Sequence, residues 1–176
     1  ARDSKEYTYP EIVEMATSTK PFGSFINPDD ALFANPTSML AAIEEFCQRT
    51  GQISPRSDAE IVRTIFESLA LRYREVLEML EGMAPFAIEV LHIIGGGSKN
   101  RLLNQYTANA INKRVIAGPS AATAIGNVMM QAIGAGVVAS LAEARAIIRA
   151  SVDTEEFMPE SIEAWDEAYN RFKSLK

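Results

Sequence analysis

The chain contains few of the residue types on which many reactive sites depend. Among its 176 residues are one cysteine, Cys47, and one histidine, His92, so an internal disulfide is impossible. The sequence also shows no Ser–His–Asp set, no group of residues with metal-ligand spacing and no pair of candidate catalytic carboxylates. These absences leave the chain without an evident reactive centre of its own.

Positive charge is scarce as well. The chain has 17 lysines and arginines against 23 acidic residues, which gives a net charge of −6. No basic run and no basic patch with interleaved aromatic residues stands out, which argues against nucleic acid as a partner. An anionic ligand would therefore have to be held by local backbone dipoles, with a metal ion as a further option.

Long uninterrupted hydrophobic runs are missing too. The most apolar window, residues 129–141, is broken by a glutamine and two glycines and is followed by charged residues, so it predicts a packed helix rather than a membrane span. With no signal peptide and a single cysteine, the simplest interpretation is a reduced, cytoplasmic setting without a membrane partner. The chain begins at Ala1 rather than at a methionine, which fits a fragment of a longer protein.

What is present is an apolar content of 47%, enough for one domain with a hydrophobic core. Periodicity and capping residues predict a short helix after Pro10, followed by an ordered, apolar loop. Further helices are predicted at 35–51, 57–82, 98–111 and 120–138, from 140 and from 159 onward, and strands at 88–94 and 114–117. The residues that cap these helices are predicted to be Ser57 with Glu60, Ser98, Ser120, and Ser140 with Glu143.

The order strand, helix, strand, helix between residues 87 and 138 predicts an α/β fold with a short pair of parallel strands. Both strands are apolar throughout, which is typical of strands that are covered on both faces. Two short parallel strands do not form a stable sheet alone. The sequence therefore predicts an incomplete sheet, whose remaining strands lie outside this chain or come from another chain.

The most informative stretch is the glycine turn, residues 95–98, where the first predicted strand gives way to a helix. Gly95, Gly96 and Gly97 let a ligand approach the backbone closely, and Ser98 can cap the helix or bond a phosphate oxygen. Asn100 faces the same mouth, where it can bond a ribose or a base. Bare N–H groups at the start of a helix suit a phosphate or another anion. The alternative is a tight turn packed under a neighbouring helix, since the spacing matches neither a P-loop nor the G-x-G-x-x-G fingerprint.

A second turn, residues 118–126, follows the second predicted strand. Because parallel strands end at the same edge of a sheet, this turn is expected to lie beside the glycine turn, where open α/β sheets bind ligands. Thr123 offers a hydroxyl group in this segment. The small residues around it favour close packing of helices as its role instead.

The remaining reactive side chains have structural interpretations. His92 lies within a strand that is predicted to be buried and is expected to be a core residue, while Cys47 is expected to be inert on a helix face. Asp29 and Asp30 favour the cap of a turn over a metal site. The acidic residues expected on the solvated face of the long helix are Glu67, Glu75 and Glu78.

Several long stretches, in the same order along the chain, resemble the FGGY family of carbohydrate kinases. The stretches are 7–12 (YTYPEI), 21–30 (PFGSFINPDD), 60–73 (EIVRTIFESLALRY), 91–105 (LHIIGGGSKNRLLNQ), 115–119 (VIAGP) and 123–127 (TAIGN). The resemblance extends through residues 165–169 (WDEAY) and thus covers nearly the whole chain. It is greatest to the members that phosphorylate L-rhamnulose.

The resemblance implies an actin-like (ribonuclease-H-like) ATPase fold and transfer of the ATP γ-phosphate to the 1-hydroxyl of L-rhamnulose, with Mg²⁺. It identifies residues 1–176 as a partial C-terminal, nucleotide-binding domain, with the sugar-binding domain and the catalytic aspartate upstream. The glycine turn is then the part that contacts ATP or ADP, with Gly96 as the best candidate and Gly95 and Gly97 beside it. Asn100 falls where a related sugar kinase, glycerol kinase, has an asparagine at the adenine. The chain by itself is expected to be inactive.

Two positions depart from the family pattern. Ala121 stands where the family usually has a glutamate, and Thr64 replaces a cysteine of some relatives, which leaves Cys47 without a disulfide partner. Two alternative functions stay open. One is a kinase for another ketose, such as L-fuculose or L-xylulose. The other is a non-catalytic module that self-associates through an exposed sheet edge.

Overall fold

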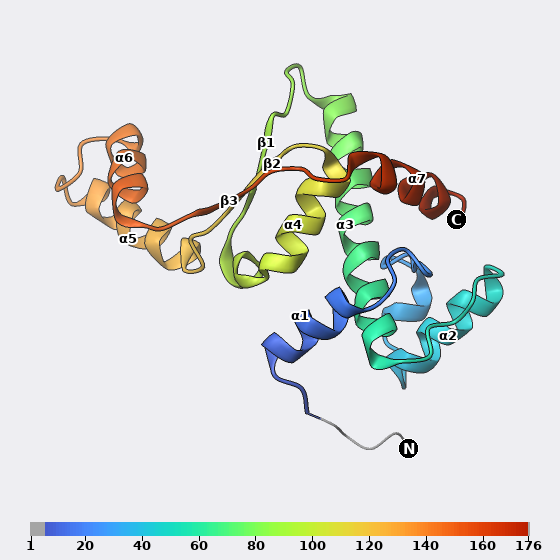
Figure 1. Ribbon diagram of the computed structural model, residues 1–176. Coiled ribbons are helices and arrows are strands. Elements are labelled where there is room, and N and C mark those ends of the chain that lie inside the picture. The colour runs from blue at the N-terminus through green and yellow to red at the C-terminus, as the bar shows by residue number, and fades with distance from the viewer. Residues whose placement is uncertain (1–5, 176) are drawn as a thin grey trace.

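The computed structural model describes residues 6–175, which form helices around a small three-stranded sheet (Figure 1). Two 3-10 turns, η1 (Ala31–Phe33) and η2 (Gly95–Lys99), connect longer elements. The helices are α1 (Tyr9–Ser18), α2 (Met39–Arg49), α3 (Asp58–Met83), α4 (Arg101–Ile111), α5 (Ala122–Gly134), α6 (Leu141–Ser151) and α7 (Ile162–Lys173), and the strands are β1 (Val90–Ile93), β2 (Arg114–Ala117) and β3 (Glu155–Phe157).

The long helix α3 organises the main body, because α1, α4 and α7 all pack against it (Figure 1). Its start confirms the predicted capping box: the Ser57 hydroxyl accepts from the Glu60 N–H at 3.2 Å, and the Glu60 carboxylate accepts from the Ser57 N–H at 3.1 Å. The predicted pair of Ser140 and Glu143 at the start of α6 is confirmed in its Ser140 bond. Local capping chemistry thus sets the starts of both helices.

Replacing the cap of α3 is expected to destabilise the fold. Ser57→Ala removes the acceptor for the Glu60 N–H, and we expect the free energy of unfolding to fall by about 1 kcal/mol. Urea denaturation followed by circular dichroism measures the loss. Ser120→Ala is the matched control, because α5 has no side-chain cap, and a loss of equal size in the control would contradict the assignment.

The sheet has the order β1–β2–β3. Strands β1 and β2 run parallel with His92 opposite Ile116, which confirms the predicted parallel pair, and β3 adds antiparallel to β2 with Phe157 opposite Val115. Strand β3 was not predicted, and the helix predicted from 159 begins only at Ile162. Strand β3 escaped prediction because it contains only three residues, two of them glutamates, and forms only through pairing with β2.

Strand β1 differs from its predicted burial. It lies at one edge of the described sheet, where Leu91 and Ile93 are half-buried and His92 is exposed. The expectation that β1 is covered on both faces and that His92 is a core residue was therefore wrong. Among the described strands, β1 pairs only with β2, which agrees with the predicted incomplete sheet.

Helix α5 is also less buried than predicted. Figure 1 shows α5 and α6 set apart from the other helices. Although α5 is rich in apolar residues, it has no buried residue, and Val128 and Met130 are more than half exposed. It begins after Ala121 rather than at a Ser120 cap and ends at Gly134 instead of 138, so both predicted ends were wrong.

Among residues 6–175, no helix combines the length and apolarity needed to cross a bilayer.

The main core lies where α3, α4, α7 and the loop before α2 meet. Phe25 is fully buried there, which confirms the predicted ordered loop, and its ring packs edge-on against Phe172 at 6.4 Å between centroids. The rings of Trp165 and Tyr106 lie 5.3 Å apart between centroids in the same cluster. Burial of these aromatic side chains fixes α4, and with it the end of the glycine turn, to the long helix.

Candidate functional site

The two predicted turns lie side by side at the ends of β1 and β2. The Gly118 N–H donates to the Ile93 carbonyl at 2.8 Å, and the Gly95 N–H donates to the Pro119 carbonyl at 3.1 Å. Gly118 has φ +116°, and a Cβ there would lie 3.0 Å from the Asp153 carbonyl oxygen. The structure thus confirms that parallel strands bring both turns to one edge of the sheet.

The glycine turn itself presents open backbone. Gly95 has φ +76°, which favours glycine, and a Cβ added at Gly95 or Gly96 would meet no heavy atom within 4 Å. At Gly97 the nearest atom would be Ile93 Cγ2 at 3.8 Å, an ordinary contact. Within residues 6–175, no helix packs against the turn at Gly95 or Gly96. The geometry leaves room for a ligand against the main chain, and the ligand contacts of the three glycines stay a prediction.

Helix α4 is capped by Asn100, and not by Ser98 as was predicted. Ser98 does not cap α4, because the 3-10 turn η2 comes first and the Ser98 hydroxyl donates to the Gly95 carbonyl at 2.7 Å. Asn100 is the cap, with its Oδ1 accepting from the Leu103 N–H at 3.0 Å. The Asn100 oxygen is thus engaged within the chain, and its amide NH2 is the group left to bond a ribose or a base, which stays a prediction.

Sequence reasoning missed Asn104, one helical turn after Asn100. Asn104 is 1% exposed, and its Nδ2 donates to the Ser98 carbonyl at 2.9 Å, so it ties the glycine turn to α4. The available signal was the spacing of four residues between the two asparagines, which places both on one side of a helix that begins at the turn.

The other candidates have the following places in the structure. Cys47 is fully buried, and burial raises the pKa of its thiol, which confirms the inert role. Asp30 caps η1 by accepting from the Leu32 N–H, as predicted for a turn cap. Thr123 is exposed, so its predicted packing role was wrong within this chain. Within residues 6–175, no group of three or more His, Cys, Asp or Glu side chains is arranged to hold a metal ion.

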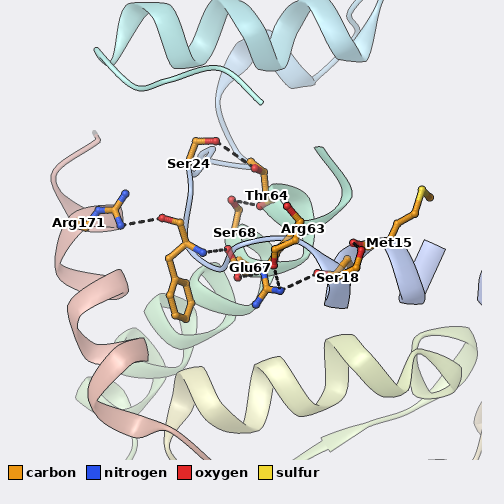
Figure 2. Close-up of polar contacts among 11 residues, drawn as sticks. Met15, Ser18, Ser24, Arg63, Thr64, Glu67, Ser68 and Arg171 are labelled. Atoms are coloured by element: carbon orange, nitrogen blue, oxygen red, sulfur yellow. Dashed lines mark hydrogen bonds and ion pairs between the residues drawn. The ribbon is translucent and has the colours of Figure 1, made fainter. Parts of the chain in front are cut away.

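The acidic residues of α3 divide between surface and interior. Glu78 is exposed as predicted, but Glu67 is 1% and Glu75 6% exposed, so the solvated-face expectation was wrong for both. Figure 2 shows Glu67 among its partners: its Oε1 accepts from Arg63 Nε at 2.7 Å, and its Oε2 accepts from the Phe22 N–H at 2.9 Å. Burial raises the pKa of the Glu67 carboxyl, and the hydrogen bond from Arg63 opposes that shift.

A surface hollow of about 580 Å³ lies beside this buried pair. Its lining includes both Arg63 and Glu67, together with Arg171, whose Nη1 donates to the Phe22 carbonyl at 3.0 Å. Arg63 and Glu67 are paired with each other, and Glu67 and Arg171 both bond the backbone of Phe22 in the loop before α2. The arrangement therefore fastens the loop to α3 and α7.

Comparisons with known proteins agree with this architecture. Residues 1–135 match the model of the FGGY family of carbohydrate kinases, C-terminal domain. The chain belongs to the FGGY family of carbohydrate kinases. Among curated FGGY relatives, it is 54% identical over 167 residues to the rhamnulokinase of Bacteroides thetaiotaomicron, covering 95% of this chain and 34% of that protein. It is 40% identical over 158 residues to the rhamnulokinase of Bacillus subtilis, covering 90% and 33%.

Solved structures support the same fold. The xylulose kinase from Rhodospirillum rubrum aligns with a TM-score of 0.66 at 20% identity, over 98% of this chain and 34% of that one. Plasmodium falciparum glycerol kinase, solved with ADP, aligns with a TM-score of 0.62 at 16% identity, over 96% and 32%. The predicted helix-rich, actin-like fold with an incomplete sheet is thereby confirmed. The chain spans about a third of the length of the curated FGGY relatives that it matches.

Proposed function

We propose that this chain is the nucleotide-binding part of an ATP-dependent sugar kinase that converts L-rhamnulose to L-rhamnulose 1-phosphate. The observation that carries the proposal is the open backbone of the glycine turn, beside the turn that follows β2. Two rhamnulokinases among its relatives support the choice of substrate, and the similarity in fold to a glycerol kinase solved with ADP supports the choice of nucleotide.

In this proposal the chain's own residues bind and orient the nucleotide. The backbone of Gly95, Gly96 and Gly97 lies against the phosphates of ADP or ATP, with the start of α4 adding a favourable dipole. Ser98 and the amide NH2 of Asn100 lie beside them. Holding the phosphoryl group in line with its acceptor supplies much of the rate acceleration in such transfers.

The groups that complete the reaction come from outside residues 1–176. Mg²⁺ accompanies the nucleotide in this proposal, and residues 6–175 contain no group of three or more His, Cys, Asp or Glu side chains arranged to hold it. The sugar-binding domain and the catalytic carboxylate belong to the remainder of a longer kinase in this proposal. The chain alone is accordingly expected to show no rhamnulose-dependent consumption of ATP.

A chimera tests the proposed role directly. The matched C-terminal third of the Bacteroides thetaiotaomicron rhamnulokinase is replaced by this chain, which is 54% identical to it. We expect the chimera to bind ADP, measured by isothermal titration calorimetry, and to phosphorylate L-rhamnulose in a coupled assay, whereas the 176 residues alone do not. A folded chimera that binds no ADP would contradict the nucleotide-binding role.

The choice of sugar needs a separate experiment. In the chimera the sugar contacts come mostly from the partner protein, so it reports little on specificity. Comparing L-rhamnulose, L-fuculose and L-xylulose as substrates of the longest natural protein that contains this chain tests the substrate. A higher kcat/KM for L-fuculose or L-xylulose than for L-rhamnulose would favour the alternative ketose kinase.

A second candidate, self-association of the isolated chain, is favoured by one observation. Strand β1 has a free edge in the described sheet, next to a groove lined mainly by apolar side chains of α3 and β1, including Val76, Leu80 and Leu91. An unpaired strand edge beside apolar surface promotes pairing between copies. Light scattering on the 176-residue chain separates a monomer from a self-associated form.

A further inference from the structure

The glycine turn is held to its surroundings by a small number of hydrogen bonds. At its start, the Gly95 N–H donates to the Pro119 carbonyl, and the Ser98 hydroxyl closes the turn on the Gly95 carbonyl. At its end, the Ser98 carbonyl accepts from Asn104 Nδ2 at 2.9 Å. This last bond is a direct side-chain link from the end of the turn to the body of α4.

The side chain that makes this link is incompletely satisfied. Asn104 is 1% exposed, and its Oδ1 is a buried side-chain polar atom that no donor within residues 6–175 reaches. A buried carbonyl oxygen without a protein donor costs free energy of folding, and buried side-chain oxygens of this kind are rare. A leucine of similar size would avoid that cost. The unpartnered oxygen therefore adds nothing to stability, and what the amide contributes at this position is the bond from its Nδ2 to the Ser98 carbonyl.

We infer that Asn104 is a positioning residue for the glycine turn. Its Nδ2 fixes the Ser98 carbonyl, and this holds the open backbone of Gly96 and Gly97 in one conformation before a ligand arrives. The inference rests on the proposed function, since the benefit of a fixed turn is tighter binding of the adenine nucleotide. A backbone that is already ordered loses less conformational entropy on binding.

A neighbouring asparagine on the same helix provides a contrast. Asn109 is 7% exposed, and its Oδ1 accepts from Gln105 Nε2 at 2.7 Å and from the Glu160 N–H at 2.9 Å. These contacts join α4 to the segment before α7 and do not involve the glycine turn. Asn109 thus has the role of an ordinary buried amide in the fold, and it serves as the matched control.

The test compares Asn104→Leu with Asn109→Leu. Asn104→Leu removes the bond to the Ser98 carbonyl, which lowers stability, and the unpartnered oxygen, which raises it, so we expect a urea midpoint close to that of the parent chain. Amide hydrogen exchange of residues 96–100, measured without nucleotide in the full 176-residue chain, is expected to become at least tenfold faster. In the chimera, the dissociation constant for ADP is expected to rise about tenfold. Asn109→Leu is expected to lower the midpoint and to leave both exchange and ADP affinity within twofold.

A second variant keeps the size of the side chain. Asn104→Asp places an oxygen where the amide nitrogen lies, facing the Ser98 carbonyl, so we expect faster exchange at 96–100 together with a lower midpoint. Unchanged exchange in both Asn104 variants, or a lower midpoint for Asn104→Leu with unchanged ADP affinity, would show a purely structural residue and overturn the inference. If exchange accelerates as expected but the parent chimera binds no ADP, the positioning role stands and the proposed function fails.

Discussion

Gly96→Val is expected to weaken ADP binding by about tenfold to a hundredfold without loss of stability. The isopropyl group would occupy the open space in front of the turn and keep phosphate oxygens from the backbone. A hydrogen bond between a backbone N–H and a charged oxygen is worth roughly 1.5–3 kcal/mol, which sets the size of the effect. We expect the fold to tolerate the change, since a Cβ at Gly96 would meet no heavy atom within 4 Å and the φ of Gly96 is not in the left-handed region.

The measurement is calorimetric titration of ADP into the chimera, with urea denaturation of each variant alongside. Gly23→Val is the matched control, because Gly23 also has open space around its Cα and an ordinary φ but lies in the loop before α2. Gly95→Val is unsuitable, since its φ of +76° would strain any side chain. Equal ADP affinity in the parent chimera and Gly96→Val, with both folded, would remove the glycine turn from the nucleotide site.

Glu67→Leu is expected to lower the free energy of unfolding by about 3–5 kcal/mol, because it leaves a partly buried charge without its partner. The Arg63 side chain is 13% exposed and would lose its counter-charge, while the Phe22 N–H would lose its acceptor. Arg63 Nη1 also donates to the carbonyls of Ala16 and Thr19, at 2.8 Å each, so the pair joins α3 to the end of α1.

Urea denaturation of the 176-residue chain checks this expectation, with Glu78→Leu as the matched control. Glu78 also pairs with an arginine four residues earlier, Arg74, and accepts from the Tyr169 hydroxyl, but its side chain is 47% exposed. We expect Glu78→Leu to lower the free energy of unfolding by about 1 kcal/mol, because the ion pair that it removes is exposed. The double variant Arg63→Met/Glu67→Leu is expected to recover part of the stability. A smaller loss for Glu67→Leu than for Glu78→Leu would contradict the structural role of the buried pair.

The two expectations concern separate parts of the molecule. The glycine turn lies at the end of β1, whereas Glu67 fastens the loop before α2 to the middle of α3. A loss of stability in Glu67→Leu with unchanged ADP affinity of the folded chimera would show that the loop supports the fold alone. A parallel loss of ADP affinity would show that a shift of α3 displaces α4, which packs against it, and with α4 the glycine turn.

Features that depend on neighbours in the chain were predictable from the sequence. The cap of α3 at Ser57, the strand at 114–117 and the turn at 95–98 each rest on residues within a few positions of one another. The two turns could be placed together because parallel strands joined by one helix end at the same edge. Local hydrogen bonding and the period of the hydrophobic residues are both visible in the sequence, and they are sufficient to predict these features.

Features that depend on distant parts of the chain needed the tertiary structure. Glu67 reads as a surface residue of α3, but it is 1% exposed and accepts a hydrogen bond from the N–H of Phe22, 45 residues earlier in the chain. Strand β3 has no local signal and exists through its pairing with β2. His92 reads as buried and is exposed because its strand lies at the edge of the described sheet.

The sequence by itself thus determined the presence of the seven described helices and of the two parallel strands, and the place of the glycine turn, because caps, period and glycine act over a few residues. Only the tertiary structure decided which polar groups are buried, including Glu67 and Asn104, because burial depends on which elements pack together. Asn104 shows the difference most clearly. Its distance from Ser98 along the chain is fixed by sequence, but its enclosure between α4 and the surrounding elements comes from the fold.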